Sequence, residues 1–215
     1  MSLPIRQHLR LVACGALAVA AFAASRPSTA AENDPRWNDL LQRVMQQAPA
    51  RRAEVINLAI NQFDHAEAPG PVVWQSPQQL VQRGAGDCKD FALAKYWLLR
   101  HSGSPRERVR MAYGDVQIGT AWRRHLVVLL WTDGGSPLVL DNLLPGAHRL
   151  ADRQDLRILF SFDEAGFYEA TGANRIADQP LKGWQGLWER IAPPPAQPVT
   201  VTARQRRPAP ANAGS

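Results

Sequence analysis

The chain has 215 residues and a formal net charge of +6, and the whole of this excess lies at its two ends. Residues 1–31 carry three arginines and no acidic residue, and residues 193–215 carry three more, which leaves residues 32–192 without net charge. A balanced central part excludes the basic surface that nucleic-acid-binding domains typically present.

Residues 1–31 have the layout of a secretory signal peptide. Arg6 and Arg10 precede an apolar stretch at 11–24, and small residues follow at 28–31, where we expect cleavage. The apolar stretch is short for a membrane span, and no later segment approaches the roughly 18 apolar residues that a span needs. We therefore expect an exported, periplasmic protein without a transmembrane segment in the mature chain.

Cys14 offers an alternative for this leader. Leu11-Val12-Ala13-Cys14 is similar to a lipoprotein cleavage box, which would anchor the protein through a lipid on Cys14. Most of the apolar stretch follows Cys14 instead of preceding it, which is the wrong order for that processing.

The remaining chain divides into one domain, residues 32–192, and a Pro/Arg-rich tail, residues 193–215. The domain has about 160 residues, which is enough for a single hydrophobic core. The tail cannot bury a core, and we expect it to be disordered.

Helices are predicted for the first half of the domain. Apolar residues recur at helical spacing over 37–45 and 55–63, and Asp34-Pro35 is a start signal for the first helix. Ser76-Pro77 predicts a short helix that ends at Gly84-Ala85-Gly86.

The next predicted helix carries the most apolar sequence of the chain. Asp87 is a natural N-cap, and the helix that follows is apolar on nearly every side from Phe91 to Leu99 before Gly103 and Pro105 end it. We expect this helix to be central and buried.

Strands are predicted for the second half. The segments 109–113, 125–131 and 138–141 are strand-like, with a turn at 133–137 between the last two. Helices followed by a hairpin predict an α+β fold in which the central helix packs on an antiparallel sheet.

Cys88 lies directly after the N-cap Asp87. If the leader is removed, Cys88 is the only cysteine left, so no intramolecular disulfide can form. The first turn of a helix favours a thiolate, because the positive end of the helix dipole and free N–H groups lie there. The alternative is that Cys88 is a small buried apolar residue without chemistry.

A thiolate nucleophile needs a base, and His125 is the best candidate. Of the five histidines, His125 alone opens an apolar strand. The chain runs about as far from His125 to the turn as from the turn to Asp141, so an antiparallel pair returns both side chains to one end of the sheet. Asp141 has an alternative role as a residue that ends a strand. The order Cys, His, Asp is typical of a nucleophile, its base and an orienting carboxylate.

At these residues the sequence resembles the bacterial transglutaminase-like cysteine proteinases, which include the LapG-type periplasmic proteases that release surface adhesins. The resemblance lies in Trp74-Gln75-Ser76-Pro77, Gly86-Asp87-Cys88 with Asp90, His125 before Leu-Val-Val-Leu-Leu, and Leu140-Asp141-Asn142, within about residues 55–145. It implies a papain-like or transglutaminase-like core with Cys88 as nucleophile, His125 as general base and acid, and Asp141 orienting the imidazole. It also implies an oxyanion hole made by the Cys88 N–H and a donor from Trp74 or Gln75.

The resemblance also implies calcium, but one position departs from it. The adhesin-releasing branch carries an acidic residue directly after the nucleophile, where this chain has Lys89. Asp87 and Asp90 could still supply oxygen ligands, whereas the lysine would repel the ion. We therefore expect no required cofactor and a weak or absent dependence on calcium.

The resulting hypothesis is a periplasmic cysteine endopeptidase that cleaves an exported or surface protein, such as an adhesin, through an acyl-enzyme. By resemblance, an inner-membrane receptor would regulate it. The sequence leaves two alternatives. With the same triad, a transglutaminase would use an amine in place of water, and an amidase would act on a cell-wall peptide. A catalytically silent periplasmic binding module would keep only the fold.

Overall fold

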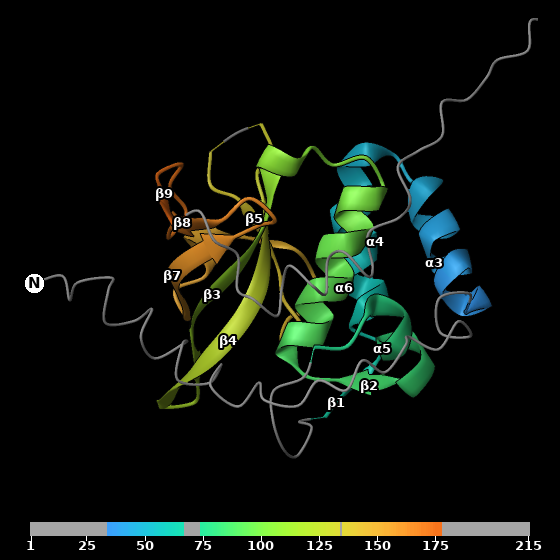
Figure 1. Ribbon diagram of the computed structural model, residues 1–215. Helices are drawn as coiled ribbons and strands as arrows, with labels where there is room; N and C mark the ends of the chain where they lie inside the picture. The colour runs from blue at the N-terminus through green and yellow to red at the C-terminus, as the bar shows by residue number, and fades with distance from the viewer. Residues whose placement is uncertain (1–33, 67–73, 134, 178–215) are drawn as a thin grey trace, which may run out of the picture.

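The computed structural model describes residues 34–66, 74–133 and 135–177. The predicted signal peptide and the C-terminal tail lie outside the described residues. In the described part, helices form one layer and a seven-stranded antiparallel sheet forms the other (Figure 1). None of the described helices has the length and apolar character that a membrane span requires.

Within the described residues, three helices precede the central one, and each begins at a proline. They are α3 (Pro35–Met45), α4 (Pro49–Ile60) and α5 (Pro77–Arg83). Asp34 caps α3, and Ser76 caps α5 in a capping box with Gln79, at the two helix starts that the sequence predicted. Gly84 ends α5 with a φ of 72°, a conformation that favours glycine.

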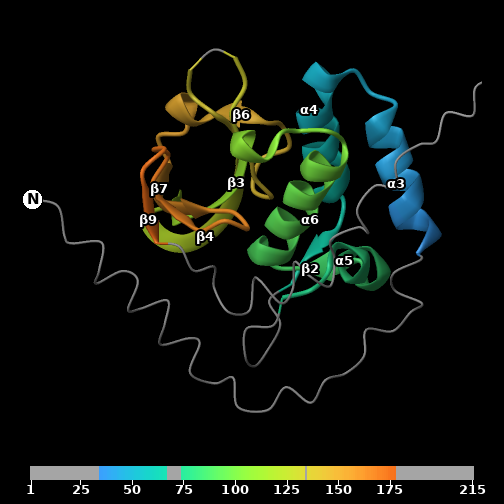
Figure 2. The same cartoon turned by 45° about the horizontal axis from the view of Figure 1, so that its top comes forward.

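The central helix α6 (Cys88–His101) is capped by Asp87, whose side chain accepts from the Lys89 N–H. Every residue from Asp90 to Leu99 is buried, including Lys95, which has no exposed surface. The helix lies between the sheet and the pair α3 and α4 (Figure 2). The prediction of a buried central helix is confirmed.

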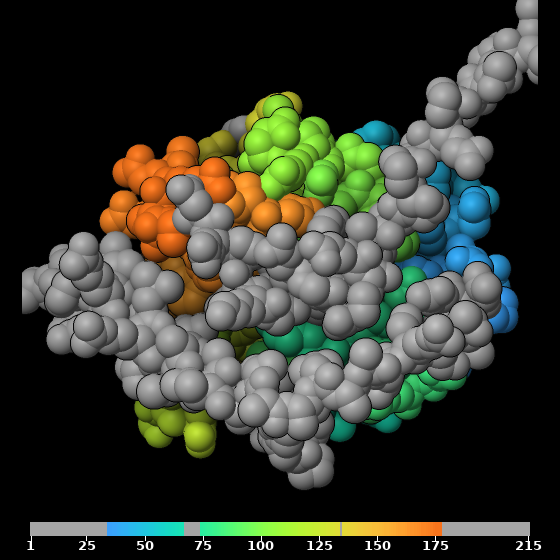
Figure 3. Space-filling model, viewed as in Figure 1, coloured from blue at the N-terminus to red at the C-terminus, as the bar shows by residue number. Residues whose placement is uncertain are grey.

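The sheet has the order β6-β5-β4-β3-β7-β8-β9, and every neighbouring pair is antiparallel. Its strands are β3 (Val109–Ile118), β4 (Ala121–Leu130), β5 (Leu138–Leu140), β6 (His148–Arg149), β7 (Leu156–Phe162), β8 (Phe167–Glu169) and β9 (Arg175–Ala177). Short 3-10 turns lie at Arg106–Arg108 and Leu150–Asp152, and β1 (Asp64–His65) pairs in parallel with β2 (Ala85–Gly86). Strands β7 to β9 lie across the molecule from α3 and α4 (Figure 3).

The sheet differs from the sequence-based expectation at the start of β4 and in its later strands. Strand β4 begins at Ala121, so His125 lies within the strand and does not open it. The first four residues of β4 are accessible, and burial starts at His125, so the apolar pattern marked the buried half of the strand. Strands β7 to β9 were not predicted.

The core explains why β4 is continuously apolar after His125. Val128 and Leu130 face the helices in the larger cluster of buried side chains, whereas Val127 and Leu129 belong to a second cluster on the other face of the sheet. A strand that is covered on both faces loses the alternation of apolar and polar residues. His125 therefore lies where the strand passes from solvent into the core.

Candidate active site

Cys88 is the first residue of α6 and is half-buried, with a free thiol. Two reciprocal hydrogen bonds fix the N-cap Asp87. Its side chain accepts from the Lys89 N–H at 3.0 Å, and its backbone N–H donates to Asp90 Oδ2 at 3.2 Å. This capping box fixes the backbone at the start of the helix, where the helix dipole favours an anion. The sulfur is thus placed at the position predicted from the sequence.

His125 contacts both of the other predicted residues. Its Nε2 lies 2.7 Å from Asp141 Oδ1, and its side chain also forms a hydrogen bond with Cys88. Because Nε2 faces Asp141, Nδ1 remains for the sulfur. Burial opposes the charged imidazolium, but the hydrogen bonds and charges of Asp141 and Cys88 outweigh it and raise the pKa of His125 to about 9.

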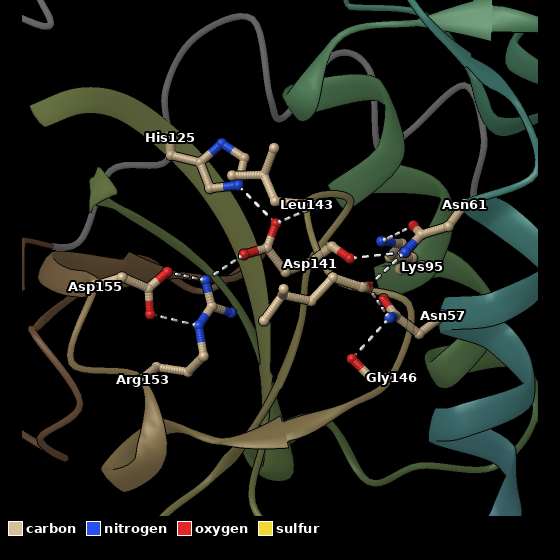
Figure 4. A network of polar contacts seen from close by, with 10 residues as sticks. Asn57, Asn61, Lys95, His125, Asp141, Leu143, Gly146, Arg153 and Asp155 are labelled. Atoms are coloured by element: carbon tan, nitrogen blue, oxygen red, sulfur yellow. Dashed lines mark hydrogen bonds and ion pairs between the residues drawn. The ribbon is translucent and has the colours of Figure 1, made fainter. Parts of the chain in front are cut away.

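Asp141 follows directly after β5 and has no exposed side-chain surface. Its Oδ1 accepts from the Leu143 N–H at 3.0 Å as well as facing His125 (Figure 4). Asp141 therefore ends the strand with a local turn and holds the histidine at the same time, so the two roles considered from the sequence coincide. Burial raises the pKa of Asp141, but the contacts with His125, Leu143 and Arg153 lower it below its ordinary value.

The sheet register brings His125 and Asp141 together. Strand β5 pairs with β4 through Val128 and Leu140, so Asp141 leaves the ladder one residue beyond the last pair. The two side chains are then at the same end of the sheet, next to the start of α6, which packs on β4. The hairpin argument made from the sequence agrees with this geometry.

Three residues at this site were not anticipated from the sequence. Arg153 Nη2 donates to Asp141 Oδ2 at 2.8 Å, and Asn61 Nδ2 donates to the Asp141 carbonyl at 2.9 Å. Lys95 Nζ in turn donates to Asn61 Oδ1 at 2.6 Å (Figure 4). Of these, only Lys95 left a sequence signal, since it is the only charged residue between Phe91 and Leu99.

Trp74 and Gln75 lie near the start of α6, but Gln75 is bound to Asp90. Its backbone N–H donates to Asp90 Oδ1 and its Nε2 to Asp90 Oδ2, both at 3.0 Å. Gln75 therefore ties the segment before α5 to the first turn of α6. Trp74 packs against the core.

The predicted calcium ligands are already engaged by donors. Lys89 Nζ pairs with Asp87 Oδ2 and lies 3.8 Å from Asp90 Oδ2, and both oxygens of Asp90 accept from Gln75. Burial raises the pKa of Asp90, against the effect of its donors. Across residues 34–66, 74–133 and 135–177, no group of three potential metal-binding side chains occurs. The acidic residues at the start of α6 do not fit a calcium site, which needs six to eight oxygens.

A family comparison shows to which family this chain belongs. The model of the bacterial transglutaminase-like cysteine proteinases matches residues 23–153, which is more than half of the chain. The chain belongs to this family. The match includes Cys88, His125 and Asp141 and ends at Arg153, so the assignment as a cysteine proteinase rests on the same segment as the site.

Solved structures of the same type agree with the family. The calcium-bound LapG of Legionella pneumophila has 28% sequence identity and a TM-score of 0.64, over 73% of this chain and 87% of that one. The EGTA-treated LapG of the same organism gives the same identity and TM-score, over 73% of this chain and 86% of that one. Among curated proteins, no match was found. The proteinase fold of this chain is thus of the LapG type.

Proposed function

We propose that this protein is a periplasmic cysteine endopeptidase with Cys88 as nucleophile, His125 as general base and acid, and Asp141 as the residue that orients the imidazole. The observation that carries the proposal is the buried 2.7 Å contact between His125 Nε2 and Asp141 Oδ1, made while His125 also bonds Cys88 at a helix N-terminus. A structural cysteine would have no need of a charged imidazole partner.

In the reactive state the proton of Cys88 lies on His125, which the hydrogen bond between them permits, so a thiolate faces an imidazolium. The thiolate attacks the carbonyl carbon of the substrate, and the oxyanion that develops lies at the N-terminus of α6, where the Cys88 N–H can donate to it. His125 then protonates the leaving amine as the C–N bond breaks, which leaves a thioester. Water attacks the thioester, passes its proton to His125, and releases the acid and the free thiol.

A second donor for the oxyanion is proposed from Trp74 or Gln75, the two residues that the family resemblance implies. Gln75 donates to Asp90 through both its backbone N–H and its side-chain amide, so it also holds the start of α6. Both side chains carry an N–H group from which an oxyanion can accept a hydrogen bond.

The proposed substrate is an exported or surface protein, such as an adhesin, and the proposed regulator is an inner-membrane receptor. Both are what the resemblance to the LapG-type periplasmic proteases implies, and the membership of a cysteine proteinase family supports a protein substrate. The LapG structures include a calcium-bound form, but we propose that this chain works without calcium, because the Lys89 ammonium occupies the acidic groups at the start of α6.

The first test is the reaction of the purified protein with a thiol-directed probe from about pH 5 to about pH 9. The wild-type protein should be labelled in its folded state even at acidic pH, where ordinary thiols react slowly. His125→Ala and Asp141→Asn should weaken labelling, and Cys88→Ala should abolish it, which also controls for Cys14. Labelling that appears only after denaturation would show that Cys88 is a buried structural residue.

The nature of the acceptor needs a separate assay. A labelled protein substrate is offered together with a primary amine, and the products are separated into hydrolysed chains and amine conjugates. Hydrolysis alone supports the endopeptidase, whereas incorporation of the amine into the substrate that depends on Cys88 would favour a transglutaminase.

A further inference from the structure

Arg153 reaches Asp141 from the side opposite His125. It precedes β7, and its side chain is only 3% exposed. The Nη2 atom donates both to Asp141 Oδ2 at 2.8 Å and to Asp155 Oδ2 at 2.9 Å, and Nε donates to Asp155 Oδ1 at 2.9 Å (Figure 4). Asp155 thus holds the guanidinium in a two-pronged contact and directs one nitrogen at Asp141.

The two oxygens of Asp141 have separate partners as a result. Oδ1 faces His125 and the Leu143 N–H, and Oδ2 faces Arg153. A carboxylate can turn about its last bond, and a turn would exchange the two oxygens or take both out of the imidazole plane. Arg153 opposes this turn, because the rotated carboxylate would leave a buried oxygen without a donor, which is costly.

The charges around Asp141 come from three sides. His125 on β4 and Arg153 contact the carboxylate directly, and Asp155 touches Arg153. Helix α6 contributes Cys88, which bonds His125, and Lys95, whose pKa is affected by Asp141. Helix α4 contributes the uncharged Asn61, which binds the Asp141 carbonyl. Among the described residues, the Asp141 carboxylate therefore has two cationic hydrogen-bond partners, the imidazolium of His125 and the guanidinium of Arg153.

We propose that Arg153, oriented by Asp155, is a positioning residue of the proteinase site: it fixes the Asp141 carboxylate so that Oδ1 faces His125, and its charge helps to set the pH range in which Cys88 is reactive. The inference rests on the proposed function of Cys88, His125 and Asp141. It extends the site to Arg153 and Asp155, which lie in the segment that connects β6 to β7.

The test measures the labelling rate of Cys88 against pH, because this needs no substrate. Arg153→Met removes the cation and the donor to Oδ2. Loss of a nearby positive charge disfavours the thiolate, so the acidic limb of the profile should move up by about one pH unit. At any pH on the acidic limb this shift lowers the rate roughly tenfold, and the plateau at higher pH should also fall because Asp141 is no longer held.

Two milder variants separate charge from position. Arg153→Lys keeps the positive charge but lacks the planar guanidinium that donates to two carboxylates. Its acidic limb should therefore match the wild type, whereas its plateau should stay low. Asp155→Asn removes an anion, which by charge alone would move the limb to lower pH. A lower plateau in this variant therefore reports loss of orientation, and Asp155 is 42% exposed, so the variant should fold.

Arg52→Met is the matched control. Arg52 is a part-buried arginine that donates to the backbone carbonyls of Gln47 and Ser102, at the opposite end of α6 from Cys88. It should leave both limb and plateau unchanged, and thermal unfolding of every variant should confirm a folded protein.

The outcomes are distinct for the inference and for the proposed function. If Cys88 is reactive in the wild type and the folded Arg153→Lys and Asp155→Asn variants keep the wild-type pH profile, the proposed role of Arg153 is overturned. The proposed function is then unaffected. An equal loss in Arg52→Met also overturns the role of Arg153, because the effect would then follow general destabilisation. An unreactive wild-type Cys88 overturns the proposed function, and Arg153 then has no site to position.

Discussion

Lys95 Nζ lies 2.6 Å from Asn61 Oδ1 inside the core, and this contact links the central helix to the loop that carries Asp141. Asn61 uses its other end to donate to the carbonyls of Asp141 and Leu144, at 2.9 and 2.8 Å. Lys95 is seven residues beyond Cys88, two helical turns along the same face of α6. Burial lowers the pKa of Lys95 to about 7, although Asp141 acts to raise it.

Lys95 and His125 should give the stability of the protein two opposing pH dependences. The pKa of His125 is raised from 6.5 to about 9, so its contribution to stability is complete below pH 6.5 and is lost as the pH rises through 9. The pKa of Lys95 is lowered from 10.5 to about 7, so the unfolded state binds more protons between these values and stability rises with pH there.

Single variants should separate these two contributions in urea unfolding. Lys95→Met leaves the histidine, and its free energy of unfolding should fall between about pH 6.5 and pH 9, by a few kcal/mol at most. His125→Asn leaves the lysine, and its free energy of unfolding should rise from about pH 7 upward. Parallel curves for the two variants would contradict this assignment.

Asp141→Asn should lower the pKa of His125 from about 9 towards its ordinary value. An amide can still accept a hydrogen bond from Nε2, but it lacks the charge that stabilises the imidazolium. The measurement is a titration of the histidine ring signals by nuclear magnetic resonance. Asp115→Asn is the control, because Asp115 pairs with Arg124 next to His125 in sequence but makes no described contact with the imidazole ring. An unchanged His125 titration in Asp141→Asn would show that other groups hold the proton.

Gly114→Ala should destabilise the sheet where β3 lies between β4 and β7, next to His125. Gly114 pairs with His125 across β3 and β4, at the point where the register between β3 and β7 shifts. A Cβ at this position would collide with the backbone carbonyl of Arg157 and come within 3.2 Å of the Ile158 Cα. The backbone of β7 would have to move, and we expect a loss of about 1–3 kcal/mol in the free energy of unfolding.

The control for this strand glycine is Gly119→Asn. Gly119 lies in the turn between β3 and β4 with a φ of 62°, which asparagine tolerates, and no atom lies within 4 Å of a Cβ there. Its unfolding midpoint in urea should stay close to that of the wild type. A Gly114→Ala protein as stable as the control would mean that β7 can give way at Arg157.

Calcium should leave the wild-type melting temperature unchanged, whereas Lys89→Asp should respond to it. The substitution removes the ammonium from Asp87 and Asp90 and adds a third carboxylate at the start of α6. Added calcium should then raise the melting temperature by a few degrees relative to an EGTA-treated sample, because a bound ion stabilises the folded state. Lys89→Ala is the control, since it removes the cation without adding a ligand. A wild-type protein stabilised by calcium would refute the argument from Lys89.

Local signals in the sequence were sufficient for the helices and for the position of the nucleophile. Asp34, Ser76 and Asp87 cap three helices whose starts were predicted at these residues. These signals work because a cap and its helix are neighbours in the chain. The same holds for the pairing of His125 with Asp141, which follows from one hairpin of short range.

The sequence alone thus determined the α+β class, the buried central helix and the placement of Cys88, His125 and Asp141 near one another. The tertiary structure alone decided the surroundings of Asp141, where Arg153, Asn61 and Lys95 meet from three separate segments. It also decided that Gln75 binds Asp90 and that β7 to β9 extend the sheet. Contacts between distant segments depend on how the layers pack. A buried polar group needs a hydrogen-bond partner because packing has removed its water, and which group becomes that partner follows from the packing and not from the local sequence.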